Sequence, residues 1–217
     1  MSGARLKAVI AGAGGKMGRA LIEAVLADDA LALVALLDAK GSPALGTEIG
    51  GFKVGSDAAA AATLGEVLFD FTRPEGTLAH LQACLKAGTA MVIGTTGLSD
   101  SQMNSIRQAG KKIPIVLAPN FAVGVNVLFK LAETAAQALG DAYDVEIVEA
   151  HHRHKVDAPS GTALEIGELV AKALKRDLKK VAAHGRSGDT GVRPGKQIGF
   201  HAIRGGDIVG EHTVIFA

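Results

Sequence analysis

The sequence of 217 residues has no tryptophan, few other aromatic residues and a single cysteine, Cys84. One cysteine cannot form an internal disulfide, so we expect a reducing, cytoplasmic setting. The place of Cys84 within a helical pattern favours a packed thiol over a nucleophile. Because the chain has 28 glycines against 7 Phe and 1 Tyr, we expect close backbone contacts and packing between small side chains.

The chain also lacks a long apolar run and a strong net charge. No apolar run approaches the roughly 20 residues that span a bilayer, and the first one breaks into glycines at Gly12 instead of continuing as a signal peptide. The net charge is +1 and the basic residues are dispersed, which predicts no nucleic acid and no membrane as partners. With 48% hydrophobic and 21% charged residues, the composition is that of a globular protein.

Apolar runs and helical patterns alternate through the first half of the chain. We predict strands at five short apolar runs: residues 6–11, 31–37, 67–71, 90–93 and 113–118. Helices are predicted between them, at residues 17–26, 57–62, 74–87 and 99–112. This alternation requires crossover connections and therefore predicts the α/β class, with a Rossmann-like, doubly wound parallel sheet in the N-terminal half.

The first glycine loop has the spacing G-x-x-G-x-x-G, at Gly12, Gly15 and Gly18. The usual dinucleotide pattern G-x-G-x-x-G would need glycine where Met17 stands, but these glycines still permit a tight turn and close approach to a pyrophosphate. Asp38 follows the second predicted strand, 20 residues after Gly18, where a carboxylate can accept hydrogen bonds from ribose hydroxyls. The pattern predicts NAD(P) binding; the alternative is a glycine-rich turn that binds nothing.

Ligands of doubly wound sheets bind at the carboxyl ends of the strands. Five segments of this chain should therefore line one crevice: residues 12–18, Asp38, and residues 71–74, 94–96 and 118–121. A carboxylate at position 38 favours NAD and repels a 2'-phosphate, whereas Lys40 close by offsets that repulsion. We therefore expect use of NADH, NADPH or both.

The second half of the chain opens with a long helical pattern at residues 123–139. We place the domain boundary there, with a dinucleotide-binding domain at 1–121 and a second domain at 122–217. Strands are predicted at residues 143–150, 197–204 and 207–216, and the pair Gly205-Gly206 is a strong hairpin signal. A helix is predicted from Ser160-Gly161-Thr162 to residue 175, with Thr162 and Glu165 as a capping box. These elements predict an α+β domain with a mixed sheet.

A basic cluster, His-His-Arg-His-Lys at residues 151–155, lies just before that helix. Such groups repel one another unless an anionic or electron-rich partner neutralises them, and a helix N-terminus beside them is an anion site. Together with a nicotinamide cofactor, the cluster predicts hydride transfer to a polarised double bond of a carboxylate-bearing substrate. The alternatives are a zinc site, a nucleic-acid contact and a solvated charged loop. No cysteine or interleaved aromatic residue supports the first two.

The segment EAHHRHKVDAPSGTA, residues 149–163, closely resembles the signature of the dihydrodipicolinate reductase (4-hydroxy-tetrahydrodipicolinate reductase) family of lysine biosynthesis. The resemblance extends over nearly the whole chain, through GAGGKMG (12–18), DFTRP (70–74), VIGTTG (92–97), PNF (119–121) and RGGDIVGEHT (204–213). It implies NADH- or NADPH-dependent reduction of a cyclic dicarboxylate to tetrahydrodipicolinate in the diaminopimelate route. It also implies a homotetramer built through the sheet of the second, substrate-binding domain.

The resemblance also implies roles for individual residues. His151 is similar to the acid/base residue of the family and Lys155 to its proton donor, while His152, Gly161 and Thr162 resemble substrate carboxylate contacts. The implied cofactor contacts are Gly12, Ala13, Gly14, Gly15, Lys16, Met17, Asp38, Gly94, Thr95, Thr96, Ala118, Pro119, Asn120 and Phe121. We predict no metal ligand, since no cysteine stands near the histidines.

Two departures from the family pattern bear on these expectations. Ala39 stands where family members often carry an arginine, so NADPH use depends on Lys40. Family chains continue beyond the strand-like run that ends at Ala217, so we expect a C-terminally shortened chain with an exposed edge and altered assembly. The alternatives to the reductase are therefore an NAD(P)-binding module without turnover and a related reductase of another imine or carbonyl acid.

Overall fold

The computed structural model describes residues 4–217. The chain divides into two compact units, the first ending at Ala118 and the second beginning at Pro119. The division lies three residues before the predicted boundary, and each unit has its own sheet and its own hydrophobic core. Among the described residues, no helix has the length and apolar character needed to cross a membrane.

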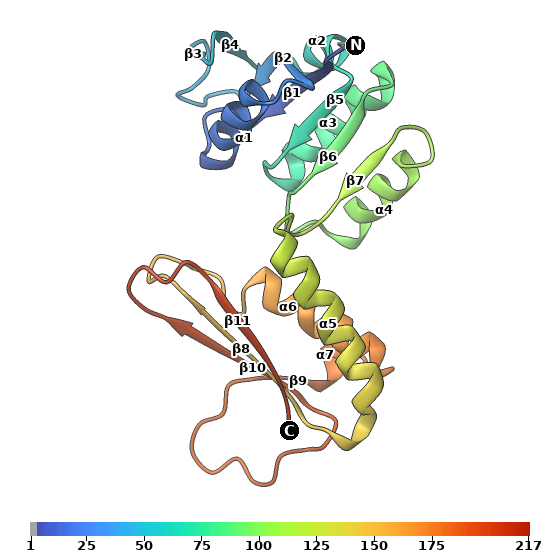
Figure 1. The fold of residues 1–217 in the computed structure, drawn as a ribbon, viewed down its shortest axis with the longest axis vertical. Helices are drawn as coiled ribbons and strands as arrows, with labels where there is room; N and C mark the ends of the chain where they lie inside the picture. Colours follow the sequence, from blue (N-terminus) through green and yellow to red (C-terminus); the bar gives the residue numbers. More distant parts are fainter. Residues whose placement is uncertain (1–3) are drawn as a thin grey trace. The chain divides into compact units, whose positions relative to one another are not determined.

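The first unit is a seven-stranded sheet in the order β3-β4-β2-β1-β5-β6-β7 (Figure 1). All neighbouring strands are parallel except β3 and β4, which pair antiparallel. The strands are β1 (Leu6–Ala11), β2 (Leu31–Leu37), β3 (Glu48–Ile49), β4 (Phe52–Gly55), β5 (Val67–Asp70), β6 (Ala90–Ile93) and β7 (Ile115–Leu117). The helices are α1 (Lys16–Ala27), α2 (Ala58–Leu64), α3 (Pro74–Ala87) and α4 (Asp100–Ala109). The predicted doubly wound, Rossmann-like sheet is confirmed.

Local signals explain the bounds of these helices. Proline stands at the first position of α3, where its missing N–H costs nothing, and Gly88 ends that helix. α4 begins with a capping box, in which Ser99 accepts from the Gln102 N–H and the Gln102 side chain accepts from the Ser99 N–H. It ends at Ala109, three residues earlier than predicted, and the short strands β3 and β4 in the glycine-rich connection were missed by the sequence analysis.

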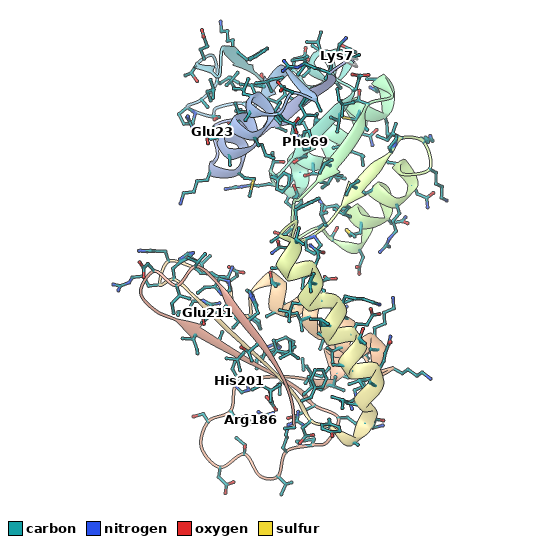
Figure 2. The ribbon with its side chains drawn as sticks, viewed as in Figure 1. Lys7, Glu23, Phe69, Arg186, His201 and Glu211 are labelled. Carbon is teal, nitrogen blue, oxygen red and sulfur yellow. The ribbon has the colours of Figure 1, made fainter. Side chains whose placement is uncertain are left out.

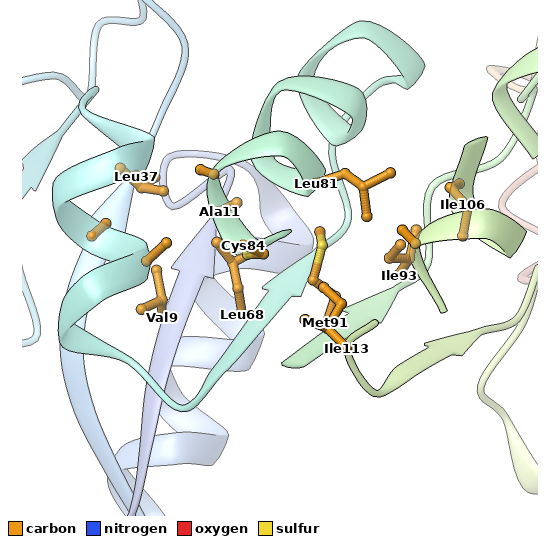
Figure 3. Packing of buried hydrophobic residues seen from close by; sticks show 14 residues of the cluster. Val9, Ala11, Leu37, Leu68, Leu81, Cys84, Met91, Ile93, Ile106 and Ile113 are labelled. Atoms are coloured by element: carbon orange, nitrogen blue, oxygen red, sulfur yellow. The ribbon is translucent and has the colours of Figure 1, made fainter. Parts of the chain in front are cut away.

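Side chains on opposite faces of the first sheet form two separate cores. In β1, Val9 and Ala11 belong to one cluster with residues of α2, α3 and α4, and Figure 3 shows this packing around Leu68, Leu81 and Cys84. The alternate residues of β1, Ala8 and Ile10, lie in the other cluster with Ile22 and Val25 of α1. Because successive side chains of a strand point to opposite faces, helices cover both sides of the sheet.

The second unit is a four-stranded mixed sheet with its helices on one face (Figure 1). Its strands are β8 (Val145–His151), β9 (Ala182–His184), β10 (Ile198–Arg204) and β11 (Glu211–Phe216). Its helices are α5 (Val123–Leu139), η1 (Gly140–Ala142), α6 (Gly161–Ala173) and α7 (Leu178–Val181). Apolar residues of α5 and α6 pack with Ile147 of β8 and Phe200 of β10 in one core.

Two predictions for the second unit are wrong. The Gly205-Gly206 pair does not form a hairpin, because the strand order is β11-β8-β10-β9 and β8 lies between the two strands that the glycines connect. The glycine backbone instead binds the turn after β8: Gly205 N–H donates to the His151 carbonyl and Arg153 N–H donates to the Gly206 carbonyl. The N-cap of α6 is Ser160 and not Thr162, since the Ser160 hydroxyl accepts from the Ala163 N–H.

Candidate active site

The glycine loop between β1 and α1 brings backbone close to backbone. A Cβ at Gly18 would overlap the carbonyl oxygen of Gly12, so only glycine lets the first turn of α1 pack on the end of β1. The Gly15 N–H donates to the Gly12 carbonyl at 3.0 Å and Gly15 is the N-cap of α1. The N–H groups of that first turn have no intrahelical acceptor, so this end of α1 can bind an anion.

Asp38 lies directly after β2 and is tied to the same loop. Its Oδ2 accepts from the Gly14 N–H at 2.8 Å, and its Oδ1 accepts from the Ala39 N–H at 2.7 Å. A Cβ at Gly14 would come within 2.8 Å of Asp38 Oδ2, so the contact requires glycine there. Each carboxylate oxygen has further lone pairs and can accept from ribose hydroxyls.

A cavity of about 530 Å³ opens beside this loop. Gly12, Gly15 and Asp38 line it together with residues of the β5–α3 segment, and its full lining is Gly12, Gly15, Asp38, Ala39, Phe71, Thr72, Arg73, Glu75, Gly76 and His80. The cavity therefore joins three of the five segments that the sequence analysis expected to line one crevice. Gly94, Thr95 and Thr96 do not line it.

The buried carboxylate of Asp70 binds the segments that follow β5 and β6, next to this cavity. Asp70, at the end of β5, is fully buried and its Oδ1 accepts from the Thr72 N–H and hydroxyl and from the hydroxyls of Thr77 and Thr95. Its Oδ2 is 2.7 Å from Nδ1 of His80. Burial raises the pKa of Asp70, but the hydrogen bond and charge of His80 outweigh it and the pKa lies below its ordinary value. The Thr95 hydroxyl therefore has internal partners and holds the end of β6 against β5.

These residues fit a dinucleotide. The open first turn of α1 suits a pyrophosphate, Asp38 suits the ribose hydroxyls, and Arg73 and His80 add nitrogen donors to the cavity wall.

Lys16 and Met17 are exposed on that turn, and Ala13 is buried beneath it. Residues 119–121 belong to the second unit, where Asn120 Oδ1 accepts from the Ala122 N–H at the start of α5. Ala118 is the last residue of the first unit.

The second unit builds a network of charged groups around the end of β8. Glu149 is 1% exposed, and Arg204 of β10 donates to both of its oxygens, at 2.7 and 2.8 Å. Glu149 Oε1 also accepts from the Ser160 N–H at 3.1 Å, and Oε2 is 2.6 Å from Nδ1 of His151. Residues 149 and 151 alternate with residue 150 along the strand, so both side chains lie on the helix-covered face.

His212 of β11 completes this network. Its Nε2 is 3.0 Å from the hydroxyl of Ser160, the N-cap of α6, and its ring meets that of His151 edge to face at 5.2 Å. Burial, and then the charge of His151, hold the pKa of His212 below its ordinary value. Three strands and the start of one helix therefore meet at His151.

The remaining predicted residues follow in the turn and in the first turn of α6. Lys155 Nζ pairs with Asp157 Oδ1 at 2.9 Å, and that hydrogen bond lowers the pKa of Asp157. His152 has a buried Nδ1 without a hydrogen-bond partner among the described residues. Gly161 and Thr162 are the first two residues of α6, so their N–H groups have no intrahelical acceptor.

Several residues of these networks were missed by the sequence analysis. Glu149, Arg204 and His212 lay within the quoted motifs but received no role, because the strand pairing that joins them was predicted wrongly. Asp70 and His80 are ten positions apart, and no local pattern marks a strand end and a helix face as partners. Within residues 4–217, no group of three or more His, Cys, Asp or Glu is arranged to hold a metal ion.

Known protein families match both units. Residues 6–121 match the family described as dihydrodipicolinate reductase, N-terminus, and residues 124–217 match dihydrodipicolinate reductase, C-terminus. The 4-hydroxy-tetrahydrodipicolinate reductase of Dechloromonas aromatica (strain RCB) is 57% identical over 223 residues, covering 100% of this chain and 82% of that protein. The enzyme of the same name from Nitrosomonas europaea is 54% identical, covering 98% of this chain and 82% of that protein.

Solved structures agree with these sequence matches. A dipicolinate-bound dihydrodipicolinate reductase from Paenisporosarcina sp. TG-14 superposes with a TM-score of 0.76 at 28% identity, covering 99% of this chain and 84% of that one. A probable aspartate-semialdehyde dehydrogenase from Pseudomonas aeruginosa, at 15% identity and a TM-score of 0.57, shares the fold alone. Two family matches that together span nearly all of the chain, relatives above 50% identity and the shared architecture show that this chain belongs to the dihydrodipicolinate reductase family.

Proposed function

We propose that this chain reduces 4-hydroxy-tetrahydrodipicolinate, or the dihydrodipicolinate formed from it, to tetrahydrodipicolinate with NADH or NADPH, in the diaminopimelate route to lysine. The observation that carries the proposal is the 57% identity, over the full chain, to a relative of that name. The glycine loop, Asp38 and the cavity beside them supply the dinucleotide site that such a reaction needs, and the network around His151 supplies proton-transfer groups.

The cofactor, when bound, supplies a hydride. The protein must hold the dicarboxylate and supply the proton that accompanies the hydride across the double bond. Lys155 carries three N–H donors, and its Nζ is 2.9 Å from Asp157 Oδ1. A carboxylate of the substrate can therefore replace Asp157 as the ionic partner of Lys155. We assign proton donation to Lys155 and acid/base exchange to His151. Binding of carboxylate is assigned to His152 and to the backbone N–H groups of Gly161 and Thr162.

The cofactor assignments belong to the same proposal. They are Gly12 to Met17 for the pyrophosphate, Asp38 for the ribose, and Gly94 to Thr96 with Ala118 to Phe121 for the remainder of the dinucleotide. Arg73 lines the same cavity as Asp38 and Ala39, so it offers a second cation, besides Lys40, for a 2'-phosphate. This supports use of both NADH and NADPH.

A homotetramer built through the second sheet, in the cytoplasm, is the final part of the proposal. The face of that sheet opposite the helices carries alternate residues of β10 and β11, of which Ile203 is 51% and Ile215 is 42% exposed. An interface through this face would cover both side chains. Light scattering of the purified chain tests the assembly.

Absorbance of NAD(P)H tests the activity. We expect its loss to depend on freshly generated 4-hydroxy-tetrahydrodipicolinate, with parallel kinetics for NADH and NADPH giving the preference. The double variant His151→Ala, Lys155→Ala should lose about 10²- to 10⁴-fold in kcat, the usual contribution of general acid–base catalysis. Normal turnover by that variant would overturn the residue roles, and absence of substrate-dependent oxidation in the unmodified chain would overturn the function.

A further inference from the structure

Glu149 is a buried carboxylate that faces away from solvent and toward the ring of His151. Its Oε2 lies 2.6 Å from His151 Nδ1, the shortest polar contact of the network around it. Arg204 holds the carboxylate from the other side with two hydrogen bonds, at 2.7 and 2.8 Å, and also donates to the Asp157 carbonyl at 2.6 Å. The carboxylate therefore has a fixed position before any substrate is present.

The charge of Glu149 decides which nitrogen of His151 carries the proton. Burial raises the pKa of Glu149, but hydrogen bonds from Arg204, His151 and Ser160 outweigh it and bring the pKa to about 2. An ionised carboxylate only accepts hydrogen bonds, so Nδ1 of His151 must be the donor. The neutral ring then has its lone pair on Nε2.

The surroundings of Nε2 differ from those of Nδ1. A Cβ at Gly210 would come within 3.0 Å of Nε2, and Gly210 has φ +152°, so backbone approaches this nitrogen only because residue 210 is glycine. The other charged or titratable groups of this network are His212 of β11, whose ring meets that of His151, Arg204 of β10 behind Glu149, and Lys155, which acts on His212 and pairs with Asp157 in the turn.

We infer that Glu149, held by Arg204, is the positioning residue of the proposed reductase site: it fixes the orientation and tautomer of His151 and leaves Nε2 as the atom that exchanges protons. This inference rests on the proposed function. Glu149 is buried, and its hydrogen-bond partners are His151, Ser160 and Arg204, so we assign its effect on proton transfer to its contact with His151.

The tautomer can be measured in the unmodified chain. Nitrogen chemical shifts of ¹⁵N-histidine-labelled protein distinguish an Nδ1–H from an Nε2–H ring, and His151→Asn assigns the signal. We expect the neutral ring of His151 to carry its proton on Nδ1. An Nε2–H ring would overturn the inference whether or not the chain proves to be a reductase, so the two failures are distinguishable.

The variant Glu149→Gln tests the kinetic consequence. We expect kcat to fall by about tenfold or more, up to the roughly 10²–10⁴-fold that acid–base catalysis contributes as a whole, with KM for the dicarboxylate nearly unchanged. The limb of the pH–rate profile that reports the imidazole should move to lower pH, because a nearby opposite charge is lost. Glu149→Asp keeps the charge and should keep the limb in place.

Glu146 provides a matched control on the same strand. Its carboxylate lies on the opposite face of β8 and is held by Arg186, Arg193 and His201, with His201 Nε2 at 2.7 Å; Figure 2 shows Arg186 and His201 in this part of the second unit. Glu146→Gln should leave the pH limb where it is. If Glu149→Gln also leaves the limb unmoved, or if both variants move it equally, the carboxylate has only a structural role and the inference is wrong.

Discussion

Replacement of Asp70 by alanine should destabilise the first unit strongly. Four hydrogen bonds reach Oδ1, from the Thr72 N–H and from the hydroxyls of Thr72, Thr77 and Thr95, and His80 reaches Oδ2. Removing one member of a buried charged pair costs about 3–5 kcal/mol. Because each 1.4 kcal/mol is a factor of ten, the opened population of this unit should rise by about 10²-fold to several thousandfold.

The chain carries a reporter for each unit. Cys84 is its only cysteine and is fully buried in the core of the first unit, and burial, with the charge of Asp70, raises its pKa to about 12. A buried, protonated thiol does not react with alkylating reagents until the unit opens. Tyr143 is the only tyrosine and lies in the second unit, so its fluorescence follows that unit. Alkylation of Asp70→Ala should accelerate by about 10²-fold or more.

Two further variants separate the causes of the stability loss expected for Asp70→Ala. Asp70→Asn keeps the side-chain volume and the oxygen that accepts from the threonine hydroxyls. Its amide N–H can donate to His80, whose tautomer is free to change. We expect this variant to lose about 1–2 kcal/mol of stability. Asp29→Ala removes a carboxylate from an exposed pair with Arg5 and should leave the alkylation rate unchanged. An acceleration below tenfold for Asp70→Ala would refute the reasoning that this carboxylate holds the ends of β5 and β6 together.

Three other predictions concern local packing and charge. Gly18→Ala should destabilise the first unit by about 1–3 kcal/mol in urea, because its Cβ meets the backbone of the glycine loop, whereas Gly124→Ala in α5, with open space around it, should not destabilise. Burial raises the pKa of Glu146, but its arginine and histidine partners lower it to about 2 from 4.5. Its stabilisation is therefore present above about pH 4.5 and lost as pH falls toward 2, and Glu146→Gln should flatten the dependence of Tm on pH in that window. Ser160→Ala should cost the second unit about 1 kcal/mol or more, measured by tyrosine fluorescence, since the hydroxyl caps α6 and contacts His212.

The sequence by itself determined most of the elements and the class of chemistry. β1, β2, β6, α3 and α5 have the predicted bounds, because a strand or helix of this kind is specified by the period of its apolar residues and by a proline or glycine at its ends. The basic cluster at residues 151–155 was visible because its members are contiguous. The glycine loop and Asp38 were visible because their spacing along the chain reflects one strand–helix–strand unit.

Only the tertiary structure decided which distant residues meet. Gly205-Gly206 carries a hairpin signal, yet β8 lies between β10 and β11 and pairs with both strands. That order brings Arg204 and His212 to Glu149 and His151. A local pattern cannot encode such a meeting, since the groups are more than fifty residues apart and their distance depends on strand register. The strand register therefore decides which histidine of the basic cluster is held by partners from other strands, and that histidine is His151.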